Sequence, residues 1–213
     1  MPLRADDLEL SRTIKRVFVW SAGLALVAFL LVQVWLSGRD QSPDAKVKRL
    51  MPAIGAELVD QPLTAEQAQW KLELDENTTV TLAQLPRDYL VFVNFWATWC
   101  EPCRNELPSM FRLRNELQDK KLIMAAVSYD DSWGDIRAFF MKWLQQVPSR
   151  QQLLLLRDPS QKEGHTLREA FGTTAMPDSY LIKNGRIVAR FVNARNWVDP
   201  SILEYFQQLT PKL

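Results

Sequence analysis

The chain has 213 residues, of which 47% are hydrophobic and 24% are charged. This balance is typical of a folded globular protein and excludes a disordered or fibrous chain. The formal net charge is only +1, so the sequence lacks the strong basic excess of many nucleic-acid-binding proteins, and we expect no nucleic-acid partner. With only two cysteines, the chain is also not a scaffold held together by several disulfides.

Residues 17–36 form an uncharged apolar run, VFVWSAGLALVAFLLVQVWL. A run of this length matches one helical crossing of a lipid bilayer. Trp20 and Trp35 lie near its ends, where aromatic rings favour the membrane interface. A buried helix of a soluble domain is the alternative, but an all-round apolar helix at a terminus rarely finds enough protein to cover it. We therefore predict a transmembrane anchor over residues 17–36.

The end of this run argues against cleavage as a signal peptide. Secretory signals have a shorter apolar core and small residues at the cleavage site. Here the core is long, and the bulky residues Val34-Trp35-Leu36 occupy its end. We expect the anchor to remain attached to the chain.

Basic residues near the anchor predict its orientation. Four Lys or Arg residues precede the run and four follow it before residue 50. Three of them lie within the five positions before the run and one within the five positions after it: Arg12, Lys15, Arg16 and Arg39. Because basic residues close to a span tend to stay in the cytoplasm, we predict a cytoplasmic tail at 1–16 and a domain in the periplasm or its equivalent.

The segment after the anchor gives weaker signals. Residues 37–55 are largely polar and are predicted to be a tether, and residues 56–213 are predicted to be one domain. Thr64 to Gln67 favours the start of a short helix. Residues 71–74 and 78–82, separated by Asp75-Glu76-Asn77, indicate a hairpin.

From residue 89 onward, apolar runs typical of strands alternate with helical patterns. The predicted strands cover residues 89–95, 122–128 and 153–156, and the predicted helices cover 104–118, the segment after the Ser132/Asp135 capping pair, and about 165–171. This alternation predicts a parallel sheet covered on both faces. Asn184-Gly185 then predicts a hairpin, and Asp199-Pro200 the start of a final helix.

The two cysteines lie in the segment Trp99-Cys100-Glu101-Pro102-Cys103, where a strand is predicted to turn into a helix. Unpaired N–H groups and the helix dipole at that position favour a thiolate. We therefore expect Cys100 to be the nucleophile and Cys103, one turn inside the helix, to be the buried resolving thiol. Glu101 opposes the thiolate by its negative charge.

Two other interpretations of the pair fit less well. A zinc site commonly needs four ligands, and the chain offers one cysteine pair and one histidine, His165. A purely structural disulfide between residues so close in sequence would constrain the unfolded chain little. A redox-active disulfide between Cys100 and Cys103 is the favoured interpretation, and we expect no metal and no other cofactor.

Two motifs carry a family resemblance: FVNFWATWCEPCRNELP at 92–108 and AMPDSYLIKNGRIVARF at 175–191. Over about residues 80–209 the chain resembles the thioredoxin fold and, more closely, the membrane-tethered TlpA/ResA/CcmG-like thiol:disulfide oxidoreductases of bacteria. The resemblance implies an α/β, thioredoxin-like fold. A central mixed sheet would be flanked by helices, closed by a C-terminal hairpin and helix, and preceded by one transmembrane helix.

The same resemblance implies roles at the second motif. Pro177 would be the cis-proline of the fold, and the backbone of Met176 would pair with an extended segment of the substrate protein, as an added strand pairs with a sheet edge. Trp99 and Pro177 would shape the docking surface. The alternative is that Met176-Pro177 is simply a turn before a strand.

Two further positions bear on proton transfer. Where thioredoxin has a buried aspartate, this chain has Asn94, which does not titrate. Glu106 matches a glutamate associated with the dithiol in ResA-like proteins, and the resemblance implies proton exchange between Glu106 and Cys103. The alternative is an exposed helix glutamate paired with a neighbouring base.

The expected activity is thiol-disulfide exchange, in which Cys100 attacks a client disulfide and Cys103 resolves the mixed disulfide. The resemblance implies a protein-disulfide reductase at the bacterial inner membrane, reduced by a membrane dithiol donor and acting on client proteins such as apocytochrome c.

Two other functions stay open. A thiol peroxidase needs Thr three residues and Pro seven residues before its reactive cysteine, where this chain has Ala97 and Val93. A copper-binding or folding adaptor would use the two thiols as a soft ligand pair.

Overall fold

The computed structural model describes residues 26–33, 43–162 and 164–213. The chain divides after Lys46 into two units, and the second carries the sheet. Of the predicted anchor, residues 26–33 are helical and exposed, while 17–25 and 34–36 lie outside the described residues, as does the predicted tail at 1–16. Within the described ranges, no helix combines the length and the hydrophobicity that a bilayer crossing requires.

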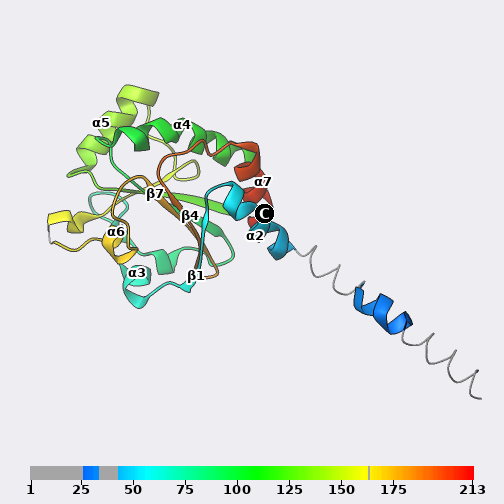
Figure 1. Cartoon of the computed structure of the whole chain (residues 1–213). Helices are drawn as coiled ribbons and strands as arrows, with labels where there is room; N and C mark the ends of the chain where they lie inside the picture. Colours follow the sequence, from blue (N-terminus) through cyan, green and yellow to red (C-terminus); the bar gives the residue numbers. More distant parts are fainter. Residues whose placement is uncertain (1–25, 34–42, 163) are drawn as a thin grey trace, which may run out of the picture. The chain divides into compact units, whose positions relative to one another are not determined.

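An eight-stranded mixed sheet forms the centre of the second unit (Figure 1). Its strands are β1 (Glu57–Pro62), β2 (Leu72–Glu73), β3 (Thr79–Val80), β4 (Leu90–Trp96), β5 (Leu122–Ser128), β6 (Leu154–Arg157), β7 (Asp178–Lys183) and β8 (Arg186–Val192). They lie in the order β1-β8-β7-β4-β5-β6-β2-β3. The neighbours β4, β5 and β6 are parallel, and every other pairing is antiparallel. The predicted parallel core and both predicted hairpins are confirmed.

Helices cover both faces of the sheet (Figure 1). They are α3 (Ala65–Gln69), η1 (Leu82–Gln84), α4 (Glu101–Glu116), α5 (Trp133–Leu144), η2 (Pro159–Lys162), α6 (Leu167–Ala170) and α7 (Pro200–Leu209). On β4, which is buried at every position, Phe92 contacts Phe206 of α7 and Trp96 contacts Phe140 of α5. Phe95 points to the opposite face and contacts Phe171, next to α6. Successive side chains of a strand face opposite sides, so α5 and α7 share one face of the sheet and α6 covers the other.

The predicted ends of several elements are confirmed. Ser132 accepts a hydrogen bond from the backbone N–H of Asp135 and caps α5, and Asp199 caps α7. Asn184 and Gly185 have φ angles of 53° and 74°, the left-handed conformation that a tight hairpin turn requires. Helix α6 begins two residues later than predicted because Thr166 forms its N-terminal capping box.

The structure corrects the predicted tether. Residues 43–53 form helix α2 (Pro43–Ala53), and the side chains of Val47, Met51 and Ile54 are buried in the hydrophobic core. These apolar residues have helical spacing, which the many polar residues between them obscure in the sequence. The start of the domain, predicted at residue 56, therefore moves to residue 47.

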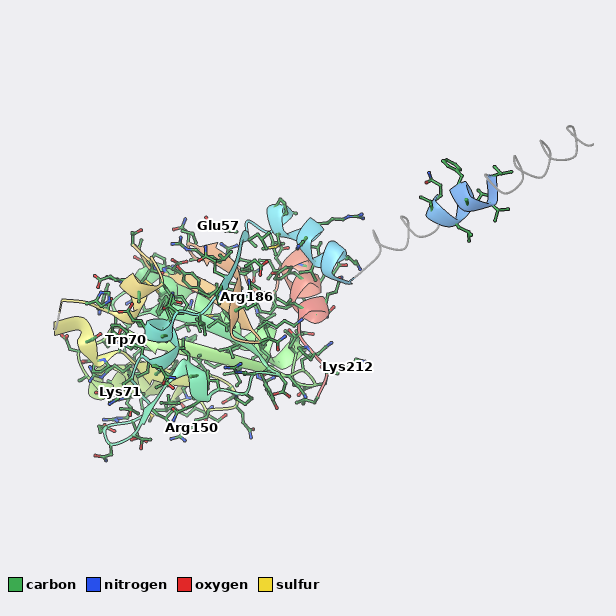
Figure 2. All side chains as sticks on the ribbon, turned by 90° about the horizontal axis from the view of Figure 1, so that it is seen from below. Glu57, Trp70, Lys71, Arg150, Arg186 and Lys212 are labelled. Carbon is green, nitrogen blue, oxygen red and sulfur yellow. A yellow bond between two sulfur atoms is a disulfide. The ribbon has the colours of Figure 1, made fainter. Side chains whose placement is uncertain are left out.

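The segment after α2 also belongs to the domain. Residues 57–62 form β1, which pairs antiparallel with β8 and was not predicted. Figure 2 labels Glu57 and Arg186 at this edge of the sheet. From Val47 onward, α2 lies beside α7 in both views (Figures 1 and 2), so this part of the segment before β1 is packed against the domain.

Candidate active site

The two cysteines lie where β4 gives way to α4, as predicted. Cys100 is the N-cap of α4 and Cys103 lies in its first turn. They are joined by a disulfide, with their Cα atoms 5.3 Å apart. The backbone N–H of Cys103 donates a hydrogen bond to the Sγ atom of Cys100 across 3.3 Å. This N–H and the helix dipole favour negative charge on Cys100 when the disulfide is reduced.

The two sulfur-bearing residues differ in access from solvent. Cys100 is 7% exposed and Cys103 is 1% exposed. The neighbouring side chain of Trp99 is 64% exposed, which is unusual for a large aromatic residue. A protein that approaches the disulfide therefore meets Trp99 and Cys100, while Cys103 lies beneath them.

The second motif comes close to the first. The carbonyl oxygen of Met176 lies 3.8 Å from the Sγ atom of Cys100, and the peptide bond between Met176 and Pro177 is cis, as the resemblance implied. The strand that follows is held by Asp178, whose buried carboxylate accepts hydrogen bonds from Thr173 (2.6 Å) and Arg190 (2.7 Å). The carbonyl group of Met176 is thus held beside the reactive sulfur.

Glu106 is buried on the helix that carries the dithiol. Its side chain is 2% exposed, so the alternative of an exposed helix glutamate is wrong. It follows Cys103 by three residues on α4, a spacing that places two side chains on one helix face with Cβ atoms about 5–6 Å apart. Burial raises the pKa of Glu106 from its ordinary 4.5 to about 7, although three hydrogen-bond donors oppose the rise.

Those donors come from two parts of the chain. Asn94 on β4 donates its side-chain N–H to Oε1 of Glu106 across 2.9 Å, and also donates to Ser179 on β7. The indole Nε1 of Trp197 and the backbone N–H of Arg195 donate to Oε2 across 2.9 and 3.3 Å. The site where thioredoxin has an aspartate therefore holds a hydrogen-bond donor to a different carboxyl group.

Sequence reasoning missed Arg195 and Trp197. Both lie in an irregular segment between β8 and α7, and no motif or periodicity marks them. It also missed Asp130, which is buried and accepts hydrogen bonds from the backbone N–H and the hydroxyl of Thr98. A signal for Asp130 was present, since it follows β5 closely and functional residues gather beyond the carboxyl ends of parallel strands.

In the part of the chain that the structure describes, the site has no cluster of metal-ligating side chains. Among those residues, no group of three or more His, Cys, Asp or Glu side chains is placed to hold a metal ion. The chemistry that the arrangement offers is a dithiol with one accessible sulfur, an adjacent backbone acceptor and a buried carboxyl group able to exchange a proton near neutral pH.

A model of the AhpC/TSA family matches residues 64–190. Thiol-disulfide oxidoreductase ResA of Bacillus thuringiensis subsp. konkukian is 25% identical over 122 residues, which are 57% of this chain and 64% of that protein. ResA of Oceanobacillus iheyensis is 34% identical over 116 residues, 54% of each chain. The match thus spans less than two thirds of the length of these curated relatives.

Solved structures show a similar fold. A Chlorobium tepidum protein, named as a candidate thiol:disulfide interchange protein DsbE, is 26% identical and superposes with a TM-score of 0.53 over 72% of this chain and 96% of its own. The thioredoxin domain of a thiol-disulfide oxidoreductase from Bacteroides vulgatus, 18% identical, gives 0.53 over 72% of this chain and 99% of its own. The expected thioredoxin-like α/β fold with a mixed sheet is confirmed.

Proposed function

The chain belongs to the AhpC/TSA family, and we propose that it is a thiol:disulfide oxidoreductase whose redox centre is the Cys100–Cys103 pair. The observation that carries the proposal is the disulfide itself, which lies at the start of a long helix, with Cys100 7% exposed and Cys103 1% exposed. The ResA and DsbE-like relatives support the same activity.

The reaction begins with the reduced pair. The Cys100 thiolate attacks one sulfur of a client disulfide, the client S–S bond breaks, and a mixed disulfide forms between Cys100 and the client. The client's other sulfur leaves as a thiolate and takes up a proton. The N–H of Cys103 and the start of α4 stabilise the attacking thiolate.

Cys103 completes the exchange. It loses its proton and attacks the Sγ atom of Cys100, so the mixed disulfide breaks, the reduced client departs and the Cys100–Cys103 disulfide forms again. Two electrons have passed to the client. Glu106 is the base that we assign to Cys103, because it is buried on the same helix face and its pKa of about 7 suits proton exchange at neutral pH.

Client binding uses the surface around Cys100. The exposed indole of Trp99 offers an apolar contact, and the Met176 carbonyl offers a hydrogen-bond acceptor to an extended client backbone. The resemblance assigns Pro177, directly after Met176, to the same surface, and its side chain is buried. Backbone pairing of this kind accepts many sequences, so the side chains around the client disulfide determine which clients bind.

We infer the direction of the reaction from the family resemblance, and its place from the N-terminal sequence. We assign reduction of client proteins at the outer face of the bacterial inner membrane, with residues 17–36 as anchor and 1–16 in the cytoplasm. A membrane dithiol donor would return electrons to the disulfide, and cysteines of apocytochrome c are the client class that the resemblance favours.

A trapping experiment tests the activity. Full-length Cys103→Ser expressed in cells leaves Cys100 without its resolving partner, and we expect mixed disulfides that are visible on non-reducing gels and lost on addition of dithiothreitol. Cys100→Ser retains a single, buried thiol and should trap nothing. Equal trapping by the two variants, or by neither, contradicts the proposed roles.

The side of the membrane on which the domain lies is tested by labelling the same two cysteines. After mild reduction of spheroplasts, a membrane-impermeant maleimide should label Cys100, because its sulfur lies outside the membrane in the proposed orientation. Double replacement of both cysteines by serine is the control for background labelling. Labelling that requires lysis of the spheroplasts would place the domain in the cytoplasm instead.

A further inference from the structure

The segment between β8 and α7 supplies two of the three hydrogen bonds to the buried Glu106 carboxyl group. The indole Nε1 of Trp197 and the backbone N–H of Arg195 both donate to its Oε2 atom. The third donor, Asn94, binds the other oxygen from the sheet. One carboxyl oxygen is therefore held by the sheet and the other by an irregular segment.

The orientation of the Trp197 indole is fixed on several sides. The residue is completely buried, its ring contacts those of Phe92 and Phe191 with centroids 4.6 and 5.3 Å apart, and its backbone N–H donates to Ser109 on α4 across 3.1 Å. A ring held in this way cannot turn its N–H away from Glu106 without disturbing the core.

Arg195 fixes the segment that carries the indole. Its Nη1 atom donates to the carbonyl oxygen of Ile54 and its Nη2 atom to that of Val192, each across 2.7 Å. The guanidinium group also lies 4.8 Å from the ring centroid of Phe191 and 5.5 Å from that of Trp197. Arg195 thus joins the residue after α2, the end of β8 and the indole into one unit.

The electrostatic surroundings of Glu106 are simple. Arg195 is the charged side chain that faces it from the packed segment, while Asn94 of β4 and Ser179 of β7 are neutral. On its own helix, Cys103 lies on the same face and Arg112 lines a surface cleft shared with Glu106. Within the described residues, the hydrogen bonds from Trp197 and Arg195 are therefore, beside that from Asn94, the contacts through which the Glu106 carboxyl group can be altered.

We propose that Trp197 and Arg195 are positioning residues of the exchange reaction, which hold the Glu106 carboxyl group in place beside Cys103 and set the pH at which it gains and loses its proton. The role rests on the proposed function, in which Glu106 exchanges a proton with Cys103. Trp197 acts through its N–H group, and Arg195 acts by holding the segment in place.

The test is a pH titration of the Glu106 carboxyl ¹³C signal by NMR in the oxidised full-length protein, with Glu106→Gln to assign the signal. Trp197→Phe keeps an aromatic ring but removes a donor to the charged form, so the midpoint should rise by about one pH unit. Arg195→Lys should raise it less. Trp133→Phe is the matched control, because its indole N–H donates to a different carboxylate, that of Glu73.

A second measurement needs no Trp197 variant. In the otherwise unchanged protein, the indole ¹H–¹⁵N signal of Trp197 should titrate with the same midpoint as the carboxyl signal, and Glu106→Gln should abolish that titration. An equal midpoint in Trp197→Phe and Trp133→Phe, or an indole signal that ignores Glu106, overturns the inference. Neither measurement depends on client reduction, so a shifted midpoint in a protein that traps no client contradicts the proposed function while it still shows that Trp197 and Arg195 control the proton of Glu106.

Discussion

Asp130 holds Thr98, the residue that precedes Trp99, by both its backbone and its side chain. The backbone N–H of Thr98 lies 3.0 and 3.2 Å from the two carboxylate oxygens, and its hydroxyl lies 2.6 Å from one of them. Arg104 in turn donates to the Thr98 carbonyl oxygen across 3.0 Å. The loop that leads into Cys100 is therefore held by Asp130, just after β5, and by Arg104 on α4.

Asp130→Ala should destabilise the protein by about 3 kcal/mol, because it leaves the half-buried donors of Thr98 and the buried hydroxyl of Ser128 without their acceptor. Urea denaturation measures the free energy of unfolding. Asp131→Ala, at the exposed neighbouring position, is the matched control and should change stability little. Equal stabilities of the two variants would show that Asp130 does not anchor the loop.

Glu106 should make stability depend on pH. Its pKa is raised from 4.5 to about 7 by folding, so between these values the folded protein keeps a proton that the unfolded chain has lost. The free energy of unfolding should therefore fall as pH rises through this window, by about 3 kcal/mol in total at about 1.4 kcal/mol per pH unit.

Denaturation of the oxidised protein at pH 5 and pH 8 measures this contribution. Glu106→Gln should remove it, whereas Glu116→Gln, an exposed position on the same helix, should retain it. A Glu106→Gln variant with the same pH dependence as the unchanged protein would mean that Glu106 does not titrate in this window.

Trp99→Ala should lower kcat/KM for a protein client by roughly thirtyfold or more, since truncation of a tryptophan at the centre of an interface costs about 2 kcal/mol or more. Because the side chain is 64% exposed, stability should change little. Reduction of a small disulfide such as dithiobisnitrobenzoate by the reduced protein is the control and should proceed at the unchanged rate. A parallel loss for both substrates would place Trp99 in the chemistry rather than in client binding.

Peroxide reduction should be absent. The position three residues before Cys100 is Ala97, which offers no hydroxyl group, and the hydroxyl of Thr98 is already bound to Asp130. Hydrogen peroxide consumption with dithiothreitol as reductant should equal that of Cys100→Ser. Consumption that depends on Cys100 and saturates with peroxide would instead support the thiol peroxidase alternative.

Met51→Ala should destabilise the domain by about 3 kcal/mol, the usual cost of truncating a buried methionine. This result would follow from the packing of α2 into the core, and it would be unexpected for a free tether. Lys48→Ala, on the exposed side of the same helix, should have little effect. Thermal unfolding of the two variants compares them directly.

Much of the fold could be predicted because its signals are local. The buried strands β4 and β5 are continuous apolar runs, and the caps Ser132 and Asp199 use side chains that bond to the nearest turn of helix. Helix α2 and β1 gave no such signal. Three side chains in and just after α2 are buried in the core, and Leu50 is half-buried against it, while β1 is an exposed edge strand that is defined by its pairing with β8.

The site, like the fold, has parts that local sequence predicts and parts that it does not. Cys100, Cys103 and the turn between them follow from local sequence. The roles of Met176 and Pro177 came from the family resemblance, and the contact of Met176 with Cys100, which joins residues 76 positions apart, came from the structure alone. Neither local pattern nor resemblance indicated the hydrogen bond from Trp197 to Glu106, because it depends on how the chain between β8 and α7 returns to α4. Contacts of this kind follow from tertiary packing rather than from short-range sequence patterns.

The unequal burial of Cys100 and Cys103 determines which sulfur atom reacts with partner proteins in the proposed function. Cys103 is shielded, so the protein that reduces the disulfide and the protein that is reduced by the dithiol must both react at Cys100. Two proteins cannot form a mixed disulfide with the same sulfur atom at the same time. In the proposed function, a donor and a client would therefore compete for the same sulfur atom.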